Sequence, residues 1–138
     1  MKKLLLLLCL AISLAIASCE SGAQEGNSNV EITAGGPLLT LAEEEHEFGQ
    51  IKKDSEAICS FKVTNTGDQP LIISKCKASC GCTVPECDPT PILPGAANEI
   101  KVQYKTDKLG TFNKFITITS NSKDSTEVKV RIKGEVIE

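Results

Sequence analysis

The sequence has few of the residues on which enzymes and nucleic-acid-binding proteins rely. It has no tryptophan, one tyrosine, one methionine and a single histidine, His46, and aromatic residues make up only 4% of its 138 residues. Acidic residues outnumber basic ones, and the formal net charge is −3. Phosphate-binding glycine loops, Gly-x-Ser-x-Gly nucleophile motifs and dinucleotide-binding fingerprints are also missing from the sequence. These absences predict a protein that is not an enzyme and does not bind nucleic acid.

The first residues have the pattern of a bacterial secretion signal. Lys2 and Lys3 precede an apolar stretch, Leu4 to Ala17, that is shorter than the roughly 20 residues needed to span a bilayer. The stretch runs into Ile16-Ala17-Ser18-Cys19, which resembles the lipobox of bacterial lipoproteins. That resemblance implies acylation of the Cys19 thiol and cleavage before it. Plain secretion with an unmodified Cys19 is the alternative.

We therefore expect three segments along the chain: a cleaved signal peptide (1–18), a lipidated Cys19 with a flexible tether (19–37) and one domain (38–138). Between residues 20 and 36, only Val30 and Ile32 are large apolar residues, too few to offset the entropy lost on ordering. Two or more acyl chains, such as palmitate, give stable membrane anchoring. The predicted location is the bacterial cell envelope, facing the periplasm or the cell surface.

From residue 38 onward, apolar and polar residues alternate, as expected for strands with one buried face. In the last such run, Val128, Val130 and Ile132 share one side while Lys129 and Arg131 share the other. Similar runs are 39–41, 48–51, 57–63, 71–73, 100–104 and 112–118. Turn signals follow at 65–68, Pro94-Gly95 (type II), 107–110 (type I) and 120–125. We predict an all-β, immunoglobulin-like Greek-key sandwich of about seven strands, with a small closed barrel as the alternative.

Several motifs in this domain resemble one bacterial family. In order they are His46-Glu47-Phe48-Gly49-Gln50-Ile51, residues 61–67, Pro70-Leu71-Ile72-Ile73, Ser79-Cys80-Gly81-Cys82-Thr83, Pro91-Ile92 and Pro94-Gly95. Together they resemble the family known as domain of unknown function 1573, which is common in bacterial lipoproteins. The resemblance covers nearly all of His46 to Val136 and implies an immunoglobulin-like sandwich with no established activity. The sequence departs from the usual pattern at Glu47, where aspartate is common, and in carrying Cys76 and Cys87 around the common cysteine pair.

Four cysteines lie close together: Cys76, Cys80, Cys82 and Cys87. Outside the cytoplasm, such a cluster most simply forms two disulfides, because the compartment is oxidising and the segment has few large apolar residues. Four cysteines allow three connectivities. One of them needs a Cys80–Cys82 bridge around a single glycine, a tight ring that we expect to be strained. The sequence therefore favours one of the two pairings that avoid this bridge, without choosing between them.

Metal binding and redox exchange are the alternatives for the same cysteines. Thiolates suit Zn(II) or Cu(I), and Cys80 and Cys82 alone could hold a two-coordinate Cu(I). The spacing, however, lacks the paired Cys-x2-Cys motifs of structural zinc sites. In the redox alternative, Lys75 and Lys77 flank Cys76 and would favour its thiolate form. No cofactor is expected if the cysteines form disulfides.

Other candidate residues are weaker. Cys59 shares its parity with the apolar residues of its run, which predicts a buried thiol. His46 is a weak candidate for a ligand or catalytic residue, and the acidic run Glu43–Glu45 is expected to be solvated rather than calcium-binding. The sequence thus predicts a lipid-anchored, non-catalytic binding module that engages an unknown protein partner. The contact would be made by the segment from Cys76 to Cys87, here called the cysteine loop, or by a sheet edge. The alternative is an envelope thiol protein that binds copper or zinc, or exchanges disulfides, through Cys80 and Cys82.

Overall fold

The computed structural model describes residues 35–138, which form eight strands and no helix. The strands are β1 (Leu39–Leu41), β2 (Glu45–Lys52), β3 (Ala57–Asn65), β4 (Ile73–Ala78), β5 (Thr83–Glu86), β6 (Ala97–Tyr104), β7 (Gly110–Ser120) and β8 (Glu127–Ile137). In this part of the chain there is accordingly no helix long and apolar enough to cross a membrane. The predicted signal peptide, the Cys19 lipid site and most of the predicted tether lie outside the described residues.

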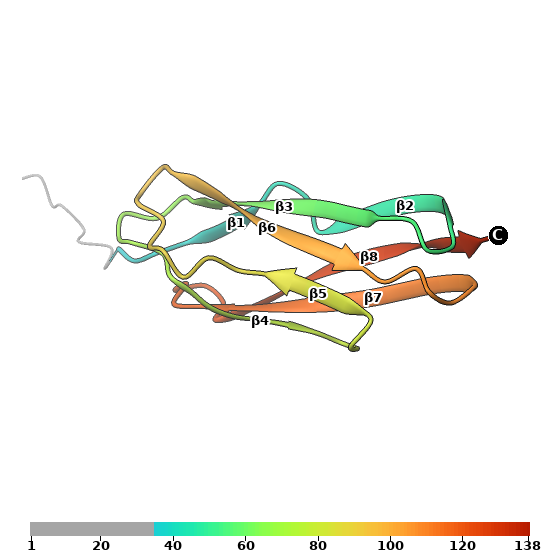
Figure 1. Ribbon diagram of the computed structural model, residues 1–138. Helices are drawn as coiled ribbons and strands as arrows, with labels where there is room; N and C mark the ends of the chain where they lie inside the picture. The colour runs from blue at the N-terminus through green and yellow to red at the C-terminus, as the bar shows by residue number, and fades with distance from the viewer. Residues whose placement is uncertain (1–34) are drawn as a thin grey trace, which may run out of the picture. The chain divides into compact units, whose positions relative to one another are not determined.

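The strands form two four-stranded sheets that face each other (Figure 1). The strand order is β1-β3-β6-β5 in one sheet and β2-β8-β7-β4 in the other. Neighbouring strands are antiparallel except β2 and β8, which run parallel. Because β5 and β4 are edge strands linked by a short connection, they close the same side of the sandwich.

Alternating side chains from both sheets fill the space between them. Along β3, every second residue is buried, and Phe61 at its centre is fully buried opposite Ile100 of β6. Burial of such side chains is the main force that stabilises the fold. The core consists of Ala57, Cys59, Phe61, Val63, Leu71, Ile73, Ile92, Ile100, Val102, Tyr104, Phe112, Ile116, Ile118, Val130, Ile132 and Val136.

The predicted fold class is confirmed, with eight strands rather than about seven. The extra strand is β5, which contains Pro85. Proline cannot donate a backbone hydrogen bond and therefore counts against a strand in the sequence, but it is tolerated on an edge strand such as β5. The two sheets remain separate, so the closed barrel does not form.

The turn predictions had mixed outcomes. Pro94-Gly95 does form a type II turn: the Ala96 N–H donates to the Leu93 carbonyl at 2.9 Å, and Gly95 has the positive φ, 78°, that this turn requires. Within residues 107–110, where a type I turn was predicted, the chain bends at Lys108. Of residues 71–73, which were predicted as a strand, only Ile73 belongs to one, as the first residue of β4. Leu71 instead forms an isolated bridge to Ile92.

The two ends of the sandwich carry different segments. At one end, the start of the described chain meets the β3–β4 connection, where the Asp68 N–H donates to the Gly36 carbonyl at 3.3 Å. At the other end, the β4–β5 and β6–β7 connections meet, and the Lys105 N–H donates to the Cys82 carbonyl at 2.8 Å. The nine-residue strand β3 runs between these ends, a length of about 26 Å. The cysteine loop therefore lies far from the point where the chain enters the domain.

Candidate functional site

The first disulfide of the cysteine cluster joins the two sheets. Cys76 lies in β4, where it pairs with Ile118 of β7, and Cys87 directly follows β5. Their Cα atoms are 6.2 Å apart and their sulfurs are bonded. Both side chains are half-buried and pack against the core. Because β4 and β5 are edge strands of different sheets, this bond links the two sheets covalently at one side of the sandwich.

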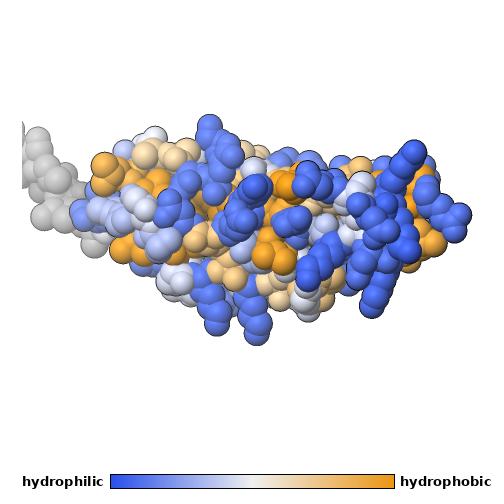
Figure 2. Space-filling view, viewed as in Figure 1, coloured by the Kyte–Doolittle hydropathy of each residue, from blue (hydrophilic) through white to orange (hydrophobic). Residues whose placement is uncertain are grey.

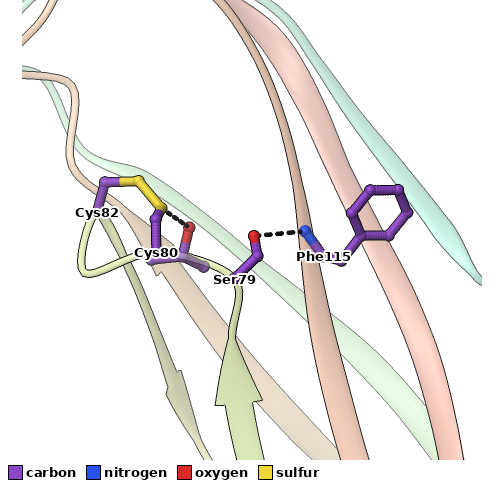
Figure 3. Close-up of a disulfide and its surroundings, with 5 residues drawn as sticks. Ser79, Cys80, Cys82 and Phe115 are labelled. Carbon is purple, nitrogen blue, oxygen red and sulfur yellow. Dashed lines mark hydrogen bonds between the residues drawn. A yellow bond between two sulfur atoms is a disulfide. The ribbon is translucent and has the colours of Figure 1, made fainter.

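The second disulfide closes the tip of the β4–β5 connection, between Cys80 and Cys82 (Figure 3). The expectation that the pairing avoids this bond is wrong. The turn brings the two Cα atoms to 5.4 Å, inside the usual range for a disulfide, so one intervening glycine suffices. Pairing of Cys76 with Cys87 also leaves the two tip cysteines as each other's partners in the cluster.

Hydrogen bonds hold this tip against the neighbouring strands. The Ser79 N–H donates to the Phe115 carbonyl at 2.8 Å. The Phe115 N–H in turn donates to the Ser79 hydroxyl at 3.2 Å, as Figure 3 shows. On the other side, the Cys80 sulfur lies 3.8 Å from the Thr83 hydroxyl. The tip is therefore anchored to β7 of one sheet and to β5 of the other.

A basic hollow of about 370 Å³ lies beside the tip disulfide. Lysine side chains outnumber the single carboxylate on its wall, so the local charge is positive although the whole chain is acidic. Its lining residues are Gly81, Cys82, Tyr104, Lys105, Asp107, Lys108 and Lys114.

A second hollow lies on the outer face of the β4–β7–β8 sheet, next to Ser79, and Phe115 is its only aromatic lining residue. The Phe115 ring is 39% exposed, and the Arg131 guanidinium lies 4.9 Å from its centroid. Lys77 and Lys129 also line this hollow. Among residues 35–138, the ion pairs on this face engage the neighbouring Arg131 and Lys133 and leave Lys77 and Lys129 without a carboxylate partner. This cationic and aromatic surface was not predicted from the sequence, although Phe115 lies on the outward parity of its strand.

His46 lies away from the cysteine loop, on β2 at the opposite edge of the same sheet from β4. Its ring meets Phe48 edge-on, with centroids 4.6 Å apart, and its Nδ1 is 3.9 Å from a Glu43 oxygen. The structure thus does not bring the histidine and the cysteines together. In residues 35–138, moreover, no group of three or more His, Cys, Asp or Glu side chains is placed to hold a metal ion.

The acidic run Glu43–Glu45 is exposed, as expected, but its last residue is also paired. Glu45 contacts Lys133 at 2.7 Å and Arg131 at 3.3 Å. The hydrogen bond from Lys133 is the main cause that lowers the pKa of the Glu45 carboxyl and raises the pKa of Lys133. This pairing leaves less unbalanced positive charge at the β2 edge of the sheet than at the β4 edge.

Cys59 is buried, as predicted, and it is the free cysteine of the described residues. Burial raises the pKa of its thiol from 9.0 to about 11. At pH 8, the thiolate fraction is therefore about 100-fold lower than at the unshifted pKa. We expect iodoacetamide to leave Cys59 unlabelled in the folded protein and to label it fully in denaturant. Labelling of the folded protein at the rate of a free thiol would contradict this account.

The family model described as "Protein of unknown function (DUF1573)" matches residues 39–136. None of the curated proteins matches the chain. Among solved structures, a protein of unknown function from Porphyromonas gingivalis aligns with a TM-score of 0.65 and 16% identity over 72% of this chain, which spans 46% of that protein. The PapD-like domain 7 of human CEP192 aligns with a TM-score of 0.62 and 6% identity over 72% of this chain and 85% of that domain. At these identities, the structural likeness shows the fold alone.

Proposed function

From the membership of this chain in the DUF1573 family, whose function is unknown, we propose that it is a non-catalytic, lipid-anchored binding module of the bacterial cell envelope. The observation that carries this proposal is the placement of the cysteine loop at the end of the sandwich opposite to the chain's entry. A domain held through a lipid on Cys19 and a tether would present this loop end away from the membrane. Loops on a rigid sandwich are the usual site for binding determinants.

The sheet edges favour the loop end over strand addition as the binding mode. Edge strands resist pairing when they are short, charged, bulged or interrupted by proline. Each edge has such a feature: β1 has three residues, β5 has four with Pro85 among them, β4 carries Lys75 and Lys77, and β2 has a register shift near Gly49. We therefore assign binding to the surface beside the cysteine loop.

The chemistry of this surface indicates an acidic protein segment as the partner. Phe115 offers an exposed aromatic ring, a residue type enriched in protein interfaces. Lys77 and Lys129 flank it with positive charge that no carboxylate of the described residues pairs. Figure 2 shows hydrophilic side chains interspersed with smaller hydrophobic patches on the face in view. An acidic segment would gain electrostatic attraction from the lysines and apolar contact with the ring.

Photo-cross-linking in cells tests this surface. A photoreactive amino acid at position 117, which lines the same hollow and leaves both lysines in place, is expected to give a protein adduct. The adduct should weaken at least severalfold when Phe115→Ala is added, because the ring supplies the apolar contact. The matched control is position 101, which is exposed on β6 of the other sheet and should give no such adduct. No adduct at position 117, equal adducts at both positions or insensitivity to Phe115→Ala would contradict the assignment.

Lipid attachment has its own test. In bacteria fed a labelled palmitate, the full chain is expected to carry the label and to sediment with membranes. Cys19→Ala should lose both properties, because it removes the thiol that carries the thioether-linked chains. Cys9→Ala, which changes the other cysteine of the N-terminal region, should retain them. Label that persists on the Cys19→Ala chain would overturn the anchoring proposal.

A further inference from the structure

The two disulfides differ in what they connect. Cys76–Cys87 links edge strands of different sheets, across 11 positions of the sequence. Cys80–Cys82 spans two positions and closes only the tip of one connection. Opening the tip bond therefore removes no link between the sheets, and the first disulfide still holds β4 to β5. The domain is built so that the Cys80–Cys82 bond can open while the fold persists.

The tip bond is also reachable. Gly81 is exposed, and no described atom outside Gly81 and its two chain neighbours lies within 4 Å of the place where a Cβ on this residue would stand. Cys82 packs against the core, whereas Cys80, on the other side of the glycine, is half-buried but not part of that packing. A thiolate approaching from solvent therefore meets the Cys80 sulfur more readily than the Cys82 sulfur.

The basic hollow lies beside the sulfur that would carry the negative charge when the Cys80–Cys82 bond breaks. Cys82 lines this hollow together with Lys105, Lys108 and Lys114, opposed by the single carboxylate of Asp107. Nearby ammonium groups stabilise a thiolate, and a better-stabilised thiolate leaves a disulfide faster. Attack at Cys80 thus releases the negative charge beside the lysines that stabilise it.

We propose that Cys80–Cys82 is an exchangeable disulfide that oxidises a dithiol partner. A partner thiolate bonds to the Cys80 sulfur, the Cys80–Cys82 bond breaks, and its electron pair leaves on Cys82. A second partner thiolate then attacks the partner sulfur of this mixed disulfide and releases Cys80. The partner gains a disulfide and loses two electrons, while Cys80 and Cys82 take up those electrons and the two thiol protons. This inference goes beyond the proposed binding function and does not depend on it.

Graded reduction of the full purified chain tests the difference between the two bonds. The protein is equilibrated with mixtures of reduced and oxidised dithiothreitol, quenched with acid and alkylated, and the labelled peptides are quantified. We expect Cys80 and Cys82 to become half-labelled at a reduced-to-oxidised ratio at least 10-fold lower than Cys76 and Cys87, with an unchanged circular-dichroism signal of the sheets. Simultaneous reduction, earlier reduction of Cys76–Cys87 or loss of the sheet signal when the tip opens would overturn the proposal.

Reduced glutathione tests the direction of attack. The oxidised full chain is mixed briefly with reduced glutathione and quenched with acid, and the residue that carries the mixed disulfide is mapped by mass spectrometry. We expect at least threefold more glutathione on Cys80 than on Cys82, because Cys82 packs against the core and Cys80 does not. Equal amounts on the two residues, or more on Cys82, would contradict the assignment of Cys80 as the attacked sulfur.

The rate at which dithiothreitol reduces the tip bond tests the role of the lysines of the basic hollow. Lys108→Gln with Lys114→Gln should slow reduction of the tip bond by dithiothreitol roughly threefold, because the departing thiolate loses nearby positive charge. Lys62→Gln with Lys101→Gln, at exposed positions of β3 and β6, is the matched control for the loss of two charges and should leave the rate unchanged. An unchanged rate in the double variant would remove the basic hollow from the mechanism.

Discussion

Replacing Asn65 by alanine is expected to destabilise the domain by about 3 kcal/mol or more, because four hydrogen bonds of a fully buried side chain are lost together. Asn65 ends β3 and is fully buried. Its amide nitrogen donates to the carbonyls of Gln69 and Ile92, each at 2.8 Å. Its amide oxygen accepts from the N–H of Gly67 at 3.0 Å and of Leu38 at 3.4 Å. One side chain thus ties the β3–β4 and β5–β6 connections to the start of the domain.

Urea unfolding of Asn65→Ala measures this loss, and Asn121→Ala is the matched control. Asn121 makes similar bonds, accepting from the Ile72 N–H at 2.7 Å and donating to the Pro70 carbonyl at 3.2 Å, but it is exposed. Water replaces those bonds in the control, so its loss of stability should stay near 1 kcal/mol. A loss below 1 kcal/mol for Asn65→Ala would show that the buried network contributes little.

Removal of the Cys76–Cys87 disulfide by the double change Cys76→Ala with Cys87→Ala is expected to cost about 3 kcal/mol. The bond closes a segment of 11 positions, so its loss returns considerable freedom to the unfolded chain. In the folded state, loss of the bond also removes the covalent link between the edge strands β4 and β5. The free energy of unfolding in urea, with the slope of the transition, measures the effect.

The matched control is Cys80→Ala with Cys82→Ala. This bond closes only two positions, and the same chain-entropy relation gives a loss of about 1 kcal/mol. The first double variant should therefore unfold at a clearly lower urea concentration than the second. The reverse order would mean that the tip bond, rather than the bond between the sheets, holds the cysteine loop together.

The alternation of apolar residues made the sandwich predictable from sequence. Residues such as Phe61 and Ile132 lie on the inward parity of their strands, and both are fully buried. Strand β5 was missed because four residues with a proline carry almost no period-two signal. Asn65 was predicted only as part of a turn, because its four hydrogen bonds join segments that are distant in the sequence.

The cysteine site was predictable in its members but not in its pairing. The spacing of the four cysteines marks a cluster, yet the partner of Cys76 depends on β4 and β5 lying at the same side of the sandwich. The surface around Phe115 also depends on cross-strand neighbours, since Arg131 lies opposite it on β8. Single-sequence patterns describe a strand's own faces and do not show which strands pair.

The stability and the reactivity assigned to the two disulfides both depend on the pairing of the cysteines, and alkylation without reduction measures this pairing. The full chain, purified in air from bacterial membranes, is denatured, alkylated, digested and mapped by mass spectrometry. Of the five cysteines after Cys19, only Cys59 should carry the label, with Cys76 linked to Cys87 and Cys80 linked to Cys82. Labels on all five, or a link from Cys76 to either tip cysteine, would contradict the account.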